Sequence, residues 1–260
     1  MTELFDLSGR VAVVTGSTRG IGKAIAEAMS AHGAKLVISS RKGPVCDQVA
    51  AEIRGAGGEA IAIPCNVSHK DQLRHLVDET RRQLGAIDIL VANAGVNPYF
   101  GTSLEIPDSA FEKILDVNVK SNHWLCQLVI PEMREQKSGV IIIVSSVAGL
   151  KGSAALGSYA ISKAADMQLA RNLAVEFGPD GIRANCIAPG VVKTDFARAL
   201  YENPEEAASQ EAWTPLRRLG TPEDIAGAAV FLAARAGAWL TGQSIVIDGG
   251  AAIVGVAPTA

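Results

Sequence analysis

The sequence predicts an α/β protein with a doubly wound parallel sheet of about seven strands and helices on both faces. Short β-branched runs alternate along the whole chain with longer segments of helical period. Several of the runs are apolar throughout, which is typical of strands that are covered on both faces. Because parallel strands need long crossovers, this alternation favours right-handed strand–helix–strand units.

Seven runs are expected to be strands and six intervening segments helices. The expected strands are 11–15, 36–39, 60–64, 87–92, 140–145, 183–187 and 244–247. The expected helices, where apolar residues recur three and four positions apart, are 21–32, 45–56, 70–84, 108–136, 158–177 and 222–235. Thr221 before Pro222, and Asp108 at the head of the long helix, are typical of helix starts. No repeat or linker interrupts the pattern, so residues 1–260 are expected to form a single domain.

Composition and charge exclude several classes of function. The 260 residues are 48% hydrophobic and carry a formal net charge of −3 without a basic block, so neither nucleic acid nor an anionic membrane is an expected partner. The first residues lack the features of a signal peptide, and no run approaches the roughly 20 apolar residues of a spanning helix. The four cysteines and four histidines are scattered, which favours buried free thiols, a cytoplasmic location and no metal site.

A glycine-rich turn follows the first expected strand, with the sequence Thr15-Gly-Ser-Thr-Arg-Gly-Ile-Gly22. Glycines let the backbone approach a pyrophosphate closely, and the helix that follows offers free N–H groups. The spacing differs from the usual dinucleotide fingerprint, and the alternative is a plain loop. Its place in the strand–helix alternation favours a dinucleotide site in a Rossmann-type domain. The expected contacts are Gly16, Ser17, Thr18, Arg19, Gly20, Ile21 and Gly22.

The second expected strand is followed by Ser40 and Arg41, where NAD-binding folds commonly place an acidic residue for the adenosine ribose. A ribose 2′-phosphate instead requires cations, and an arginine can bind it through two nitrogens. Arg19 in the glycine turn is expected to reach the same phosphate. The alternative is ordinary surface charge after a strand. The absence of an acid at Ser40 predicts that NADP(H) is preferred over NAD(H).

Tyr159 and Lys163 lie four residues apart on an expected helix and therefore share one face, and Ser146 lies upstream at a strand end. An ammonium held beside a phenol stabilises the phenolate, which lets a tyrosine give and take a proton near neutral pH. A serine hydroxyl can hold the substrate oxygen against that phenol. The alternative is a surface helix with a phenol and a solvated amine. The place of the pair in the chain favours catalysis.

Taken together, these motifs resemble the short-chain dehydrogenase/reductase family from Gly9 to Gly250. The motifs that carry the resemblance are Thr15–Gly22, Asn93-Ala-Gly95, Asn118, Ser146, Tyr159, Lys163, Pro189-Gly190 with Thr194, and Asp248-Gly-Gly250. Within the family, Ser40-Arg41 and the segments 96–101 and 217–224 resemble NADPH-dependent carbonyl reductases of aromatic ketones, dicarbonyls and retinal-like carbonyls. Asn66-Val67 stands where the family usually has Asp-Val beside the adenine, and asparagine can still accept a hydrogen bond there.

The resemblance implies four catalytic roles. Tyr159 protonates the carbonyl oxygen as hydride arrives, and Lys163 favours the phenolate and binds the nicotinamide ribose. Ser146, rather than Ser145, holds the substrate oxygen, because neighbours on a strand face opposite ways; the alternative is a local turn bond. Asn118 holds a water on the proton path, and its alternative is a surface amide.

The other expected cofactor contacts lie at the carboxyl ends of the strands, where ligands bind in such sheets. They are Ser40, Arg41, Asn66, Val67, Asn93, Ala94, Gly95, Pro189, Gly190, Val192 and Thr194, with Tyr159 and Lys163 themselves. By resemblance, Val192 and Thr194 orient the carboxamide so that the pro-S hydride is transferred.

The segment 195–215 has mixed polarity and is expected to form a short helical lid over the substrate, although its apolar residues are alternatively plain core. The expected substrate contacts are Ser146, Ala148, Leu156, Tyr99, Phe100, Phe196, Leu200 and Trp213. No cation stands out among them, which favours a bulky neutral ketone or the matching secondary alcohol.

Apolar residues on the helices 108–136 and 158–177 exceed what one sheet contact needs, and the tail 251–256 is nearly all apolar. By resemblance the chain is expected to be a homotetramer; the alternative is core packing. Other functions on this fold remain open. One is a cofactor-sensing protein without catalysis. Another is a 3-oxoacyl-thioester reductase, which needs basic residues at the pocket mouth such as Arg217 and Arg218. A third is an NAD(P)-dependent alcohol or sugar dehydrogenase.

Overall fold

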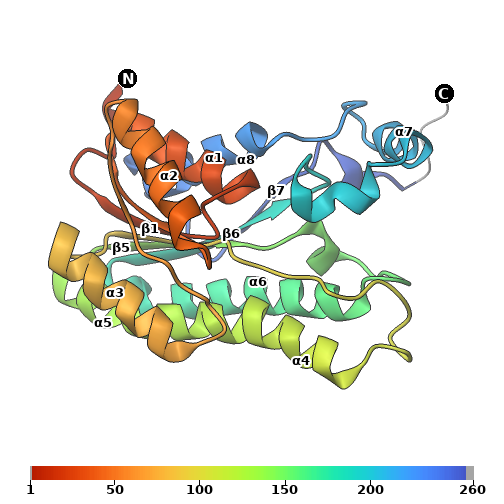
Figure 1. The fold of residues 1–260 in the computed structure, drawn as a ribbon, viewed down its shortest axis with the longest axis horizontal. Coiled ribbons are helices and arrows are strands. Elements are labelled where there is room, and N and C mark those ends of the chain that lie inside the picture. The colour runs from red at the N-terminus through yellow and green to blue at the C-terminus, as the bar shows by residue number, and fades with distance from the viewer. Residues whose placement is uncertain (1, 256–260) are drawn as a thin grey trace.

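The protein is a three-layer α/β structure in the computed structural model, which describes residues 2–255 (Figure 1). Seven strands pair in parallel in one sheet, in the order β3-β2-β1-β4-β5-β6-β7. The chain therefore starts in the middle, winds outward to β3, and returns to the other side of β1. The predicted doubly wound parallel sheet is confirmed.

The elements lie close to their expected bounds. The strands are β1 Val11–Thr15, β2 Lys35–Ser39, β3 Glu59–Ala62, β4 Ile89–Ala92, β5 Gly139–Val144, β6 Ile182–Pro189 and β7 Ser244–Ile247. The helices are α1 Gly20–Ala31, α2 Gly43–Gly55, α3 Lys70–Leu84, α4 Asp108–Leu115, α5 Ser121–Gln136, α6 Gly157–Phe177, α7 Pro204–Trp213 and α8 Pro222–Ala233. The expected start of α8 is confirmed, since the Thr221 N–H donates to the Asp224 carboxylate at 2.8 Å.

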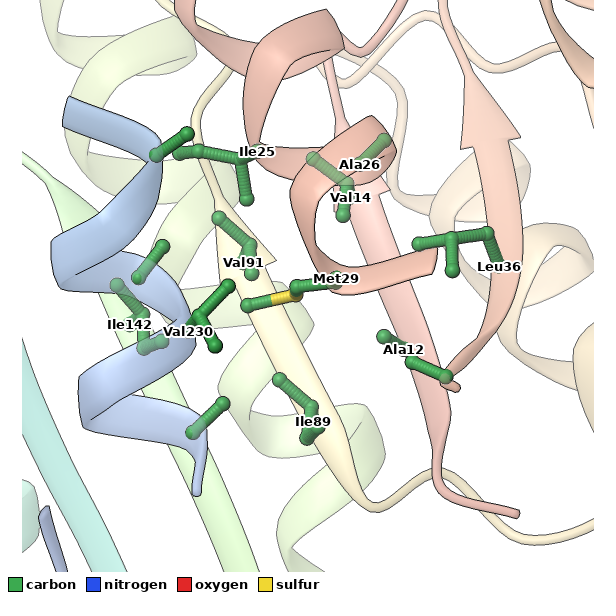
Figure 2. Packing of buried hydrophobic residues seen from close by; sticks show 14 of the residues in the cluster. Ala12, Val14, Ile25, Ala26, Met29, Leu36, Ile89, Val91, Ile142 and Val230 are labelled. Carbon is green, nitrogen blue, oxygen red and sulfur yellow. The ribbon is translucent and has the colours of Figure 1, made fainter. Parts of the chain in front are cut away.

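Helices cover both faces of the sheet, so its central strands are buried on both sides. One face is packed by α1, α2 and α8, and the other by α3, α5 and α6 (Figure 1). Figure 2 shows the first of these cores, where Met29 of α1 and Val230 of α8 meet Val91 and Ile142 of the sheet. Burial of these apolar side chains is the main favourable term for folding.

The segment expected as one long helix, 108–136, differs from the prediction. A π-helical turn at Asp116–Lys120 separates α4 from α5. Asn118 lies in this turn, and its side-chain amide bonds both the N–H and the carbonyl of Val96 in the loop after β4. Apolar residues recur at helical spacing on both sides of the turn, so the sequence pattern carried no sign of it.

The segment 195–215 forms two helical pieces, a 3₁₀ helix at Asp195–Leu200 and then α7, which lies at one end of the molecule (Figure 1). The Tyr201 hydroxyl anchors it by donating to the Thr194 carbonyl at 2.9 Å. In the tail, Ala251–Ile253 forms a 3₁₀ helix with Ile253 exposed, and Val256 lies outside the described residues. All four cysteines are buried free thiols, as expected.

Candidate active site

In the glycine-rich turn the backbone at Gly22 passes close to the backbone at Gly16. Gly16 and Gly20 have φ of +67° and +53°, a region that glycine enters without strain. A Cβ at Gly22 would lie 2.4 Å from the carbonyl oxygen of Gly16. Arg19 precedes α1 without any side-chain cap, and the first turn of α1 carries no acidic residue. The first N–H groups of α1 therefore remain available to an anion, and the turn fits a dinucleotide pyrophosphate.

The glycine turn is bonded to the end of β4. The Thr15 hydroxyl accepts the N–H groups of Asn93 and Ala94 at 3.0 and 3.1 Å. The Asn93 amide in turn donates to the Thr15 carbonyl at 2.8 Å. On its other side the turn meets Thr194, whose methyl carbon lies 3.0 Å from the position of a Cβ at Gly20. Three of the segments expected at the cofactor are thus brought together.

Ser17 is bonded within the sheet. Its hydroxyl donates to the Val14 carbonyl at 2.7 Å and accepts the Ser39 N–H at 2.9 Å, and its own N–H donates to the Ser39 carbonyl. Ser17 therefore holds β1 and β2 together behind the glycine turn. A contact with the cofactor stays a prediction for this residue.

The residues expected near the adenosine ribose lie at the end of β2. Arg41 is exposed and, within residues 2–255, no carboxylate lies within 4.0 Å of its guanidinium. Arg19 is 69% exposed and its guanidinium lies 3.2 Å from the Asp195 carboxylate. Nearby, Asn66 accepts the Ser68 N–H at 3.2 Å, which leaves its amide N–H groups free for a ligand.

The two serines after β5 face different neighbours. The Ser145 hydroxyl is buried and donates to the backbone carbonyl of Lys163 at 2.7 Å. Ser146 accepts the Ala148 N–H at 3.1 Å, which is the local turn bond considered as its alternative. That bond uses a lone pair of the hydroxyl and leaves its proton free. The geometry agrees with Ser146, rather than Ser145, as the serine that can meet a substrate.

Tyr159 and Lys163 lie on one face of α6, with the Lys163 amine 5.8 Å from the centre of the Tyr159 ring. Lys163 is only 3% exposed, and its amine donates to the Val144 carbonyl at 2.9 Å and to the Asp166 carboxylate at 3.0 Å. Burial by itself lowers the pKa of Lys163, but the surrounding charges, Asp166 first, more than reverse this and raise the pKa above its ordinary value.

Asn118 is fully buried and braces the site. Its side-chain oxygen accepts the Val96 N–H at 2.9 Å, and its amide donates to the Val96 carbonyl and to the Ser162 hydroxyl, both at 3.0 Å. A Cβ placed at Gly95 would lie 3.5 Å from the Asn118 oxygen and 3.8 Å from the Lys163 amine. Both amide N–H groups are thus used by protein groups, while the oxygen accepts one bond and keeps a second lone pair, and the predicted water contact remains a prediction.

Two buried residues of the site were missed by the sequence analysis, Asp166 and Asn122. Asp166 pairs with Lys163, and the Asn122 amide donates to the other Asp166 oxygen at 2.9 Å and to the Asn118 carbonyl at 2.6 Å. The signal was present in the sequence, because a carboxylate three residues after Lys163, between Ala165 and Met167, shares the face of the lysine.

The expected substrate contacts are brought together only in part. The Phe196 ring centre lies 6.0 Å from that of Tyr159. Phe100 is 67% exposed, and the Gly101 N–H ties its loop to the Ala155 carbonyl. Trp213 is half exposed at the far end of α7. Four further expected contacts are half-buried: Tyr99, Ala148, Leu156 and Leu200. The Tyr99 hydroxyl also donates a hydrogen bond to the Thr102 carbonyl.

The parallel sheet, the uncapped glycine-rich helix start and the tyrosine–lysine pair at the carboxyl edge define a nicotinamide-dinucleotide-dependent oxidoreductase. A family model described as "Enoyl-(Acyl carrier protein) reductase" matches residues 16–252. The chain is 40% identical over 250 residues to human "Dehydrogenase/reductase SDR family member 4", covering 96% of this chain and 90% of that protein. It belongs to the short-chain dehydrogenase/reductase family, as the resemblance implied.

Solved structures agree with this assignment. A gluconate 5-dehydrogenase from Burkholderia cenocepacia, in complex with NADP and tartrate, superposes with a TM-score of 0.93 at 31% identity, covering 97% of this chain and 99% of that one. A 7α-hydroxysteroid dehydrogenase, complexed with NADH and 7-oxo glycochenodeoxycholic acid, gives 0.92 at 38% identity, covering 96% and 97%. Between them these relatives hold both nicotinamide cofactors, so likeness alone does not decide the preference of this chain.

Two further observations concern residues 2–255. Their helices include none with the length and apolar character of a membrane span. Their histidine, cysteine and carboxylate side chains form no group of three that could hold a metal ion.

Replacing Gly22 by alanine should abolish cofactor binding, because the new Cβ would lie 2.4 Å from the Gly16 carbonyl oxygen and from the Asn93 amide nitrogen. Titration of NADPH fluorescence measures this, with circular dichroism to confirm folding. Gly55→Ala is the matched control, since a Cβ there meets nothing within 4 Å. A folded Gly22→Ala variant with unchanged affinity would show that the turn does not bind the cofactor.

Proposed function

We propose that this protein is an NADP(H)-dependent carbonyl reductase that reversibly transfers hydride between the cofactor and bulky neutral or aromatic ketones and their secondary alcohols. The observation that carries the proposal is the buried Lys163 amine, 5.8 Å from the centre of the Tyr159 ring on the same face of α6. This arrangement lies at the carboxyl edge of the sheet, next to the glycine turn.

The chemistry follows from these groups. A bound nicotinamide supplies or accepts the hydride. Ser146 would hold the carbonyl oxygen through its hydroxyl proton, and Tyr159 would donate its phenolic proton to that oxygen as negative charge develops there. Lys163 is charged and buried, so its field on the phenolate is weakly screened and favours proton release from Tyr159. Asn118 would keep the loop after β4 in place, through its bonds to Val96.

The preference for NADP(H) is supported by charge at the end of β2. Ser40 stands where a ribose-binding acid would repel a 2′-phosphate, and the exposed Arg41 has no ion-pair partner among the described residues. Arg19 holds only an exposed contact with Asp195, which costs little to exchange for a phosphate. Two guanidinium groups are thus available for one phosphate.

A neutral, bulky substrate is supported by the surroundings of Tyr159. Phe196 offers an aromatic face beside it. Two cations of the neighbouring segments are paired, Lys193 with Glu211 at 3.8 Å and Arg218 with Asp224 through two bonds of 2.6 and 2.8 Å. Of the two basic residues considered for an acidic carrier, Arg218 is thus paired with a carboxylate, whereas Arg217 donates to the Ala212 carbonyl at 2.8 Å.

A sugar-acid dehydrogenase is the second candidate, favoured by the structural likeness to a gluconate 5-dehydrogenase at 31% identity. A carboxylate-bearing substrate would need a cation at the pocket. Arg19 and Arg198 are candidates for this cation, and both are exposed and paired with the Asp195 carboxylate.

A homotetramer is supported by apolar surface on the single chain. Val175 on α6 is 82% exposed, and Trp239 before β7 is fully exposed. A groove of about 750 Å³ between α5 and α6 is lined by apolar residues such as Phe177 and by charged residues such as Arg134 and Glu176. These faces suit packing against further copies.

A cytoplasmic location is supported by the four free thiols, which persist in reducing compartments.

We expect NADPH-dependent reduction of aromatic ketones and α-dicarbonyls in a panel that also holds a 3-oxoacyl thioester, a sugar ketone and gluconate with NADP⁺. Tyr159→Phe should lower kcat by at least about 100-fold, the range for loss of a general acid. Initial rates followed by NADPH absorbance measure both. Faster turnover of gluconate or the thioester would replace the substrate assignment, and full activity of Tyr159→Phe would refute the mechanism.

Arg41→Ala should lower kcat/KM for NADPH by about 10- to 100-fold, because a charge-assisted hydrogen bond is worth roughly 1.5–3 kcal/mol. The value for NADH should stay nearly constant, which makes NADH the internal control. Steady-state kinetics with each cofactor decide the matter. A wild-type enzyme that favours NADH would contradict the cofactor proposal.

Light scattering should give a mass of about 108 kDa, four times the 27.0 kDa of one chain. The expectation rests on the exposed apolar side chains of α6 and the β7 edge. A mass near that of a single chain, at micromolar concentration, would refute the tetramer.

A further inference from the structure

Asp166 is a fully buried carboxylate whose one charged partner is the catalytic-site lysine. Its Oδ2 lies 3.0 Å from the Lys163 amine, and its Oδ1 accepts the Asn122 amide at 2.9 Å. The exposed side-chain fractions are 4% for Lys163 and 0% for Asp166. A buried carboxylate of this kind requires a function or a strong partner, since removing an ion from water is costly.

The lysine has three N–H bonds to give, and two are already used. One goes to Asp166 and one to the Val144 carbonyl at the end of β5. Because these two acceptors are fixed on α6 and in the sheet, the third N–H has a defined direction. The Gly95 backbone and the Tyr159 ring lie beside the amine, so this third N–H belongs to the reaction site.

Other ionisable groups around the pair do not replace Asp166. Cys126 of α5 and Cys186 of β6 are buried thiols, and burial raises the pKa of both, that of Cys126 to about 12, so they stay uncharged. Arg171, further along α6, is exposed. Asp180, beyond the end of α6, is bound to Arg134 and Lys137. Tyr159 is the remaining ionisable neighbour, and it is the proposed acid.

We propose that Asp166 is a positioning residue that keeps the Lys163 side chain charged in a dry site and directs its remaining N–H toward the reaction centre. The inference deepens the proposed function and rests on it, since it acts through Lys163. Burial opposes the charge of an amine, and the adjacent carboxylate offsets that effect. The pKa of Lys163 is raised despite its burial, which agrees with this role.

The first test is the pH profile of alcohol oxidation. The amide of Asp166→Asn has the shape of the aspartate side chain but not its charge. Lys163 should therefore lose its proton at lower pH and stabilise the Tyr159 phenolate less. The pH of half-maximal kcat should rise by about one unit. Asp166→Glu keeps the charge but not the shape, and its profile should lie closer to wild type than that of Asp166→Asn. An unchanged or acid-shifted profile in Asp166→Asn, or a larger shift in Asp166→Glu, would overturn the proposal.

Thr80→Val is the matched control. Thr80 is also fully buried and polar on a helix, but it lies on α3 and its hydroxyl donates to the Leu76 carbonyl rather than to a charged group. Its loss should leave the pH profile unchanged. A profile that shifts equally in Thr80→Val would mean that any buried polar deletion has this effect, and would overturn the specific role of Asp166.

A second test needs no substrate and stands even if the proposed reaction is wrong. Removing one member of a buried ion pair leaves an isolated charge, whereas removing both does not. Lys163→Met and Asp166→Leu should therefore each lower the melting temperature by several degrees, and the double variant should melt above the less stable single one. Losses that simply add would show that the two side chains are not coupled. If the wild-type enzyme reduces no ketone but this cycle holds, the proposed function fails and the buried pair remains.

Discussion

Parallel pairing of β1 with β4, where the order of the strands reverses, is the constraint on which the site depends. Val14 lies opposite Val91 in this pair, and both are fully buried, so a change of register would disrupt close packing against the helices. The pairing sets the glycine turn beside Asn93 and Ala94, where the Thr15 hydroxyl joins them. The glycine turn and the carboxyl end of β4 are therefore positioned by the same apolar contacts that stabilise the fold.

Much of the fold was predictable because its signals are local. Short apolar runs of four to six residues, with amphipathic segments between them, predicted the alternation of strands and helices along the chain. The break between α4 and α5 was not predictable, since it depends on bonds between Asn118 and Val96, which lie far apart in the sequence.

Most residues of the candidate site were predicted from their match to family motifs, and fewer from the physical properties of the residues themselves. The resemblance named Ser146, Tyr159 and Lys163, and the structure brings the latter two together on α6. It gave no sign that Ser17 would bond inside the sheet, because a motif does not show which hydroxyls the fold uses. Asp166 escaped notice for another reason: a lysine and a carboxylate three residues apart usually mark a solvated helix surface, and only the fold reveals that both are buried.

The π-helical turn at Asp116–Lys120 fixes the helical phase of everything that follows in α5. Loss of one residue there would restore a regular α-helix and rotate α5 by about 100° relative to α4. His123 would then take the place that Asn122 holds against Asp166, and the apolar stripe of α5 would turn away from the sheet. The length of this short segment is therefore as constrained as its buried Asn118, because one residue fewer would displace every contact that α5 makes with the site.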